Sequence, residues 1–266
     1  MEKQKKAEEE FHLKIFQQCY PEFPTGKINL SETPDFLVKT SQHIIGIENT
    51  MLFKQEVEKE FSLQSIESTH RKILKHACEI YKESGLPAVK VQILFSNFRE
   101  TCKSGVGKTG FTREEVKQIS QKLSQCVIEY SRLHQKTHFS KSTRLYSDRS
   151  PIEGITSIFI NLSINKGIHT LRDHIWLPIQ SESVKTDCIN EIQNSINKKN
   201  KKYQNYLKKS DECWLLLVAN RNNPSQSFRI GKKAKQHTYD SLFERTFFLE
   251  IEHQDLVQLK CKKLAN

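Results

Sequence analysis

Residues 31–50, SETPDFLVKTSQHIIGIENT, place two carboxylates beside apolar runs. Asp35 follows a proline and opens the run DFLV, and Glu48 closes the run IIGIE. Acidic residues are rare inside apolar segments unless they are paired or hold a ligand. Asp35 and Glu48 are therefore the first candidates for a functional site.

The spacing of these two acids suits a β-hairpin. Residues 34–40 and 43–50 form two predicted strands with a tight turn between them. In that hairpin Asp35 and Glu48 lie opposite each other near the open end, with Cβ atoms about 5 Å apart. Two carboxylates so close repel each other unless a cation lies between them. Mg²⁺ or Mn²⁺ would accept both as ligands and activate water for attack on a phosphodiester. The simpler alternative is a turn residue and a strand-end charge.

The elements around the hairpin alternate between helix and strand. Apolar residues recur at helical spacing over residues 5–20, and Pro21 ends this helix. Residues 27–30, KINL, are a short strand before the hairpin. Further helices are predicted over residues 60–84, 111–134 and 184–209, and further strands over residues 88–96, 155–164, 174–180, 212–220 and 244–251, the last strand of the chain. This alternation predicts an α/β fold with a mixed β-sheet flanked by helices.

The PD and (D/E)xK positions of this segment resemble the PD-(D/E)xK nuclease superfamily, which has the restriction-endonuclease-like fold. Pro34 and Asp35 match PD, and Glu48-Asn49-Thr50 stands in the place of (D/E)xK. The core of that family is a helix, a strand, a hairpin carrying the motif, a second helix and a final strand. The pattern is most similar to uncharacterised bacterial members with SPDF…GIE(x)T, whose C-terminal half the later KKNKKY…DECWLLLVA also resembles.

The resemblance assigns roles to particular residues. Asp35 and Glu48 would bind Mg²⁺ or Mn²⁺, and the main-chain carbonyl of Asn49 would complete the inner shell. A further acid would come from Glu9 in the first helix or from Glu32 in the loop, although Glu9 is equally well explained as a solvated helix charge.

One departure from the family pattern concerns the motif lysine, whose position is occupied by Thr50. A threonine carries no charge and cannot activate water as a lysine would. In this superfamily the lysine can move to a neighbouring helix, and Lys199 or Lys202 of the basic cluster would supply it here. Three functions therefore stay open: a metal-dependent endonuclease, a nucleic-acid-binding module of the same fold that no longer cuts, and a protein-interaction domain.

The chain is expected to be a single nuclease-like domain over residues 1–266, with residues 97–182 as an insertion or elaboration within it. Its formal net charge is +11, from 42 Lys and Arg against 31 Asp and Glu. This excess favours a polyanionic partner, and DNA is the preferred choice among nucleic acids. Cutting both strands of a duplex would call for a homodimer, on which the sequence gives no information.

Several other classes of protein are disfavoured by the sequence. There is no apolar run of about 18 residues that could cross a membrane, and the charged N-terminus is not typical of a signal peptide. Seven scattered cysteines argue for reduced thiols and a cytoplasmic protein. The glycine loop over residues 102–110 lacks the first glycine of a P-loop. Tyr203 and Tyr206 within the basic cluster slightly favour stacking on unpaired bases.

Overall fold

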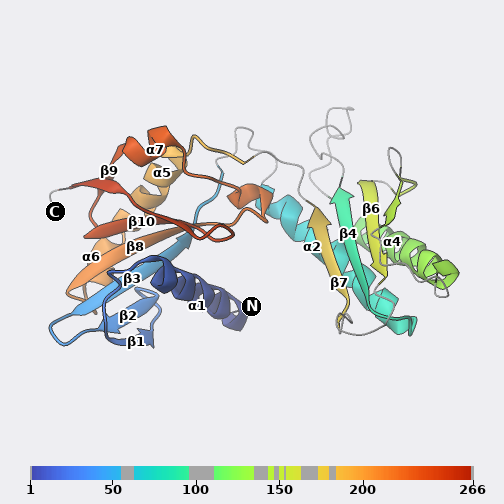
Figure 1. Ribbon diagram of the computed structural model, residues 1–266, viewed down its shortest axis with the longest axis horizontal. Helices are drawn as coiled ribbons and strands as arrows, with labels where there is room; N and C mark the ends of the chain where they lie inside the picture. Colours follow the sequence, from blue (N-terminus) through green and yellow to red (C-terminus); the bar gives the residue numbers. More distant parts are fainter. Residues whose placement is uncertain are drawn as a thin grey trace. The chain divides into compact units, whose positions relative to one another are not determined.

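The computed structural model describes residues 2–54, 63–95, 111–134, 143–146, 150–152, 154–162, 173–179 and 184–264. The chain forms two compact units (Figure 1), and each is described by itself. The first unit combines Met1–Gln55 with Ser183–Asn266, and the second is Glu56–Glu182. The expected insertion over residues 97–182 lies wholly within the second unit, whose boundary is at residue 56 rather than 97.

The first unit is a mixed α/β structure. Its elements before the second unit are α1 (Glu2–Cys19), β1 (Lys27–Leu30), β2 (Phe36–Lys39) and β3 (Ile44–Met51). Its elements after the second unit are α5 (Ile189–Asn200), α6 (Tyr203–Tyr206), β8 (Glu212–Ala219), η1 (Pro224–Gln226), α7 (Lys232–Gln236), β9 (Thr238–Ser241), β10 (Arg245–Glu250), β11 (Asp255–Gln258) and β12 (Lys260–Lys263). Six of the strands form one sheet in the order β1-β2-β3-β8-β10-β11, and β12 pairs with β9.

The six-stranded sheet is mixed, as the sequence predicts. β1, β2 and β3 are antiparallel neighbours, whereas β8 is parallel to both β3 and β10. Strands β3 and β8 therefore join the two chain segments of the unit side by side. The main chain also holds the two segments together where the second unit begins and ends. Lys54 N donates to Ser225 O at 2.7 Å, and Lys185 N donates to Ser227 O at 3.0 Å.

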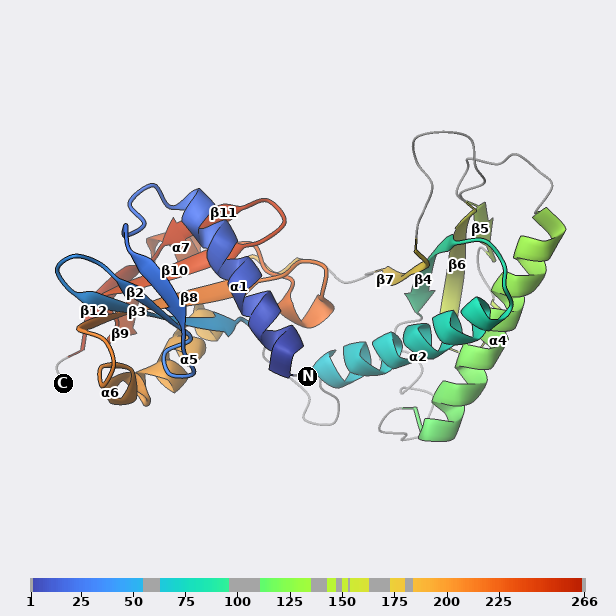
Figure 2. The same ribbon diagram turned by 90° about the horizontal axis from the view of Figure 1, so that it is seen from below.

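Helices cover both faces of this sheet (Figure 2), and the alternation of side chains along β8 shows how. Trp214, Leu216 and Val218 belong to a buried cluster with Leu13 and Phe16 of α1. The intervening residues of β8 belong to a second cluster with α5 and α6, namely Cys213, Leu215, Leu217 and Ala219. A strand buried on both faces is expected to be apolar throughout, which is what the sequence ECWLLLVA provides.

Two details of the first unit differ from the sequence-based prediction. The helix predicted over residues 184–209 is two shorter helices, because α5 ends at Asn200 and α6 begins at Tyr203. The break lets α6 bury Tyr203 and Tyr206 against the sheet. The strand predicted over residues 244–251 is not the last one, since β11 and β12 follow it.

The second unit is a four-stranded sheet packed against two long helices. Its described elements are α2 (Leu63–Glu83), β4 (Val89–Phe95), α4 (Arg113–His134), β5 (Thr143–Leu145), β6 (Ile155–Leu162) and β7 (Ile175–Ile179). The strand order is β5-β6-β4-β7. Thr112 and Glu115 form the capping box predicted for α4, with Glu115 N donating to Thr112 Oγ1 at 3.2 Å and Thr112 N to Glu115 Oε2 at 2.8 Å.

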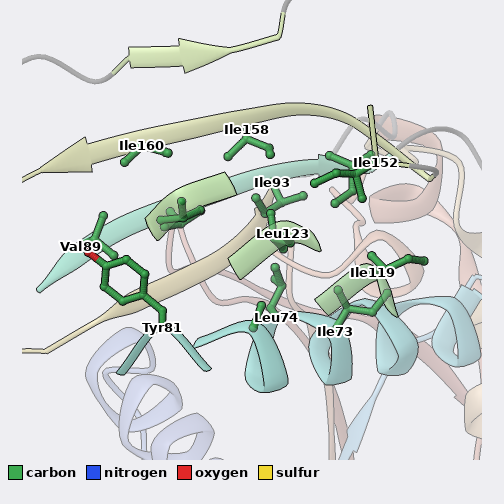
Figure 3. Packing of buried hydrophobic residues seen from close by; sticks show 14 of the residues in the cluster. Ile73, Leu74, Tyr81, Val89, Ile93, Ile119, Leu123, Ile152, Ile158 and Ile160 are labelled. Atoms are coloured by element: carbon green, nitrogen blue, oxygen red, sulfur yellow. The ribbon is translucent and has the colours of Figure 1, made fainter. Parts of the chain in front are cut away.

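The core of the second unit lies between the helices and one face of the sheet (Figure 3). Ile73 and Leu74 of α2 and Leu123 of α4 meet Ile93 of β4 and Ile158 of β6 in one buried cluster. The side chains of β4 alternate strictly between buried and half-buried, so only every second residue enters this core.

No described helix is long and apolar enough to cross a membrane. The six described cysteines are free thiols, as the sequence predicts. Cys102 and the glycine loop over residues 102–110 lie outside the described residues.

Candidate functional site

The hairpin has the register that the sequence predicts. β2 and β3 pair Phe36 with Ile47 and Val38 with Ile45. One step beyond the last pair, Asp35 is therefore level with Glu48, where β2 ends and β3 continues. Both side chains are buried. The structure thus brings the two acids together at the open end of the hairpin.

The main chain of Asn49, the residue after Glu48, forms a hydrogen bond with the Asp35 carboxylate. Its N–H donates to Asp35 Oδ2 at 2.8 Å. The N–H and C=O of one strand residue point to the same side, so the Asn49 carbonyl also points toward Asp35. No β2 residue pairs with Asn49, because the β2–β3 ladder ends at Phe36 and Ile47. This carbonyl is therefore directed into the same region as the Asp35 carboxylate.

The electrostatic environment of Asp35 differs from that of an ordinary surface acid. Burial, followed by repulsion from Glu48, raises the pKa of Asp35 to about 7. Glu9 adds to this rise, whereas the Asn49 N–H and Lys199 oppose it. The Asp35 carboxyl therefore keeps its proton to a higher pH than an ordinary aspartate does. A cation placed beside Asp35 and Glu48 would relieve the repulsion and displace that proton.

Lys199 comes from α5, on the same face of the sheet as Glu48. Its Nζ lies 2.6 Å from Glu48 Oε1, and its side chain is 20% exposed. Of the two lysines proposed from the sequence, Lys199 is thus the one that reaches the acids. Lys202 is exposed at the start of α6. The role of Lys199 in chemistry stays a prediction, but its position at the acids is a finding.

The two further acids proposed from the sequence have different surroundings. Glu9 of α1 is buried and pairs with Lys5 at 3.1 Å and with Lys6 at 3.5 Å. Its charge contributes to the rise in the pKa of Asp35. The Glu32 side chain is 74% exposed and pairs with Lys6 at 3.2 Å, so it points to solvent rather than into the buried group.

Two further residues lie next to these groups in positions that sequence reasoning did not predict for them. His12 of α1 is buried, and its Nδ1 lies 3.1 Å from Asn49 Nδ2. Burial lowers the pKa of His12 to about 4, so the imidazole is neutral at physiological pH. Tyr206 of α6 is buried on the other face, where burial and the Glu48 carboxylate raise the pKa of its hydroxyl. The helical spacing of His12 from Glu9 was the only signal in the sequence for His12. Tyr206 was selected for stacking on bases and not for contact with Glu48.

Thr50 occupies the motif position that a lysine has in the resembled family. It lies in β3, paired with Leu217 of β8, and is half-buried. Alternation along the strand places its side chain on the Glu48 face of the sheet. The positive charge next to Glu48 on this face is therefore that of Lys199, since Thr50 is neutral.

One unpaired carboxylate oxygen at the hairpin end is available to a divalent cation. Glu48 Oε2 is buried without a hydrogen-bond partner in the described part of the chain. Among the described residues no group of three or more His, Cys, Asp or Glu side chains has the arrangement of a metal site. Asp35 and Glu48 supply two such side chains, and the Asn49 main-chain carbonyl would be the third oxygen donor. Carboxylate and carbonyl oxygens are the donors that Mg²⁺ and Mn²⁺ prefer.

The expected stacking role of Tyr203 and Tyr206 is wrong. Both rings are buried against the sheet, and the Tyr203 hydroxyl donates to Glu244 Oε1 at 2.8 Å. They alternate with exposed lysines because the polar segment is amphipathic. Bases cannot reach either ring.

A comparison of the chain with protein-family models, curated proteins and solved structures finds no match.

Proposed function

We propose that the first unit is a metal-dependent phosphodiesterase, a nuclease with DNA as the favoured substrate. The observation that carries the proposal is the pairing of Lys199 with Glu48, next to Asp35 at the end of a hairpin. A lysine and two carboxylates at one buried strand end have little value for stability, because burying charges is costly.

The order of elements in the first unit supports the proposal. Along the chain it reads helix, strand, hairpin, helix, strand, through α1, β1, β2–β3, α5 and β8. This is the order of the restriction-endonuclease-like core, with the second unit inserted between the hairpin and the second helix. The likeness is one of element order, which by itself does not imply the chemistry.

The side chains divide the work of phosphodiester hydrolysis between them. Asp35, Glu48 and the Asn49 carbonyl would hold Mg²⁺ or Mn²⁺, and the bound ion would supply Lewis-acid polarisation of the phosphate and a more acidic water. Lys199, held by Glu48, orients the attacking water and stabilises the developing negative charge. The water oxygen bonds to phosphorus as the leaving P–O bond breaks, which yields a phosphomonoester and a free hydroxyl. Asn49 N–H and His12 fix the positions of Asp35 and of the Asn49 side chain.

The experiment is a cleavage assay on linear, circular and single-stranded DNA and on RNA, with Mg²⁺ or Mn²⁺. We expect cleavage by the wild-type chain, and a loss of about 10²-fold or more in Asp35→Ala, Glu48→Ala and Lys199→Ala. Lys202→Ala is the matched control, because it removes one exposed lysine from the same segment and should retain full activity.

Other outcomes would replace the proposal. Cleavage that survives in Asp35→Ala would show that a different site, or a contaminant, is responsible. Salt-sensitive binding of nucleic acid without cleavage, unchanged in the three variants, would identify a binding module in which Thr50 marks the loss of chemistry. Absence of both binding and cleavage would leave the protein-interaction domain.

A further inference from the structure

The sheet of the second unit has one face that the described helices do not cover. α2 and α4 pack on the face that carries Val91, Ile93 and Ile158. The residues between them in the sequence point the other way, and strand pairing places Gln92 level with Phe159 of β6 and with Leu177 of β7. Leu177 is 45% exposed, and Gln92 and Phe159 are half-buried. We call this face, opposite the helices, the open face.

The open face carries cations and amides beside apolar residues, because the register that places Gln92 level with Leu177 also places Lys90 level with Ile175 and Leu94 level with Ile179. Lys90 is level with Asn161 of β6, next to the Gln92–Phe159 pair. None of the four described strands β4, β5, β6 and β7 contains an aspartate or a glutamate. By contrast, β3, β8, β10 and β11 of the first unit each contain one. A carboxylate-free strip that presents cations and amides is complementary to a polyanion.

Arg144 of β5 forms an ordered pair with the aromatic ring on this face. Its Nε and Nη2 donate to Ser157 Oγ at 3.2 and 2.9 Å, and its Cζ lies 5.5 Å from the centre of the Phe159 ring. This distance is within the range of a cation–π contact. Because Ser157 fixes the guanidinium, its plane is already oriented before any ligand arrives. A planar guanidinium beside an aromatic ring is a surface on which a nucleobase can stack.

We propose that the open face binds single-stranded nucleic acid. Bases stack on the Arg144–Phe159 pair, Gln92 and Asn161 donate to and accept from base edges, and Lys90 contacts phosphate. Only an unpaired strand offers ring faces and base edges together, since a duplex hides the faces in its stack. Four strands at about 4.8 Å spacing span about 14 Å, enough for a short stretch of nucleotides. The inference deepens the proposed function, because it names the form of the nucleic acid.

The test is fluorescence anisotropy of the full chain with a labelled single-stranded oligonucleotide of about 16 nucleotides, without divalent cations. We expect Phe159→Leu, which keeps apolar bulk but loses the aromatic face, to weaken binding about 5- to 100-fold. Leu133→Ala is the control, because Leu133 is a 78% exposed apolar residue on α4. Lys90→Ala should lower the slope of log affinity against log salt concentration by about 0.7. Lys122→Ala is the matched control, because Lys122 is an exposed lysine of α4 and its loss should leave this slope unchanged.

Several results would overturn the inference. Phe159→Leu binding as tightly as wild type, or equal affinity for duplex and single strand, would exclude stacking on this face. A wild-type dimer that Leu177→Ser converts to a monomer would instead identify the face as a protein contact. The outcome is separable from that of the nuclease proposal. Phe159-dependent binding without cleavage supports the open face alone, and Asp35-dependent cleavage with Phe159-independent binding supports only the nuclease site.

Discussion

The two units bury different kinds of side chain behind similar layers of helix and sheet. In the first unit Glu9, Asp35, Glu48, Glu191 and Glu250 are buried carboxylates. In the described part of the second unit the buried polar residues are all serines, namely Ser120, Ser124, Ser131 and Ser157. The described residues of the second unit therefore form a layered core without a buried charge. The acids of the first unit are therefore not a requirement of such packing. Asp35 and Glu48 lie together at one hairpin end, whereas Glu191 pairs with Lys185 and Glu250 with His253.

The largest effect on stability should come from the apolar core of the second unit. Ile93 is fully buried among the residues of α2, α4 and β6. Ile93→Ala leaves a cavity and should lower the free energy of unfolding by about 2–5 kcal/mol. Urea unfolding followed by circular dichroism measures this loss. The exposed Leu133→Ala should change it by less than about 0.5 kcal/mol, and an equal loss in both variants would contradict the assignment of the core.

In the first unit, by contrast, removing a buried charge should stabilise the metal-free chain. The pKa of Asp35 is raised from 3.8 to about 7, so the folded state binds a proton that the unfolded state has released. The free energy of unfolding therefore falls as pH rises from about 4 to about 7. Asp35→Asn keeps an oxygen for the Asn49 N–H but cannot ionise, so it should be more stable than wild type by about 1 kcal/mol or more at pH 8.

A series of urea titrations between pH 4 and pH 8 would check this sign. Wild type and Asp35→Asn should converge toward pH 4 and separate as pH rises. Saturating Mg²⁺ should remove the difference by stabilising the wild type through ligand linkage, with little effect on Asp35→Asn. Parallel pH profiles would mean that the Asp35 carboxyl is ionised without difficulty and that the hairpin end is an ordinary turn.

The smallest effect should come from the serines that the second unit buries. Ser120 Oγ donates to the main-chain oxygens of Val116 at 2.6 Å and Ile73 at 3.1 Å. A carbonyl in a helix already accepts a main-chain hydrogen bond, so losing the hydroxyl leaves no buried group unsatisfied. Ser120→Ala should change the free energy of unfolding by less than about 1 kcal/mol. A larger loss in the same urea assay would mean that buried polar groups are as important in this unit as in the first.

The sequence predicted the local parts of the site and missed the parts formed over long distances. The hairpin register followed from alternation and from the proline before Asp35, because both strands and their turn are contiguous. Lys199 was one of two candidates in a basic segment, and only the packing of α5 against the sheet distinguishes it from Lys202. His12 carried no motif, so its contact with Asn49 depends on how α1 lies across the sheet.

Where the fold prediction was wrong, the local signal was weak. The segment between α5 and α6, Lys201 and Lys202, contains no glycine or proline to mark a break in the helix. β9 and β12 have the sequences TYDS and KCKK, whose polar residues show no apolar alternation. They are strands because they pair with each other, which is a tertiary contact. The boundary of the second unit at residue 56 was likewise set by contacts rather than by a change in composition.

The anchoring of Lys54 and Lys185 has a consequence for how this chain evolves. Both residues bind the main chain of one short stretch, at Ser225 and Ser227, so the two points where the chain leaves and re-enters the first unit are neighbours. A gene segment inserted between them lengthens a surface connection without separating β3 from β8. Another module could therefore replace residues 56–182 without altering the hairpin or its acids.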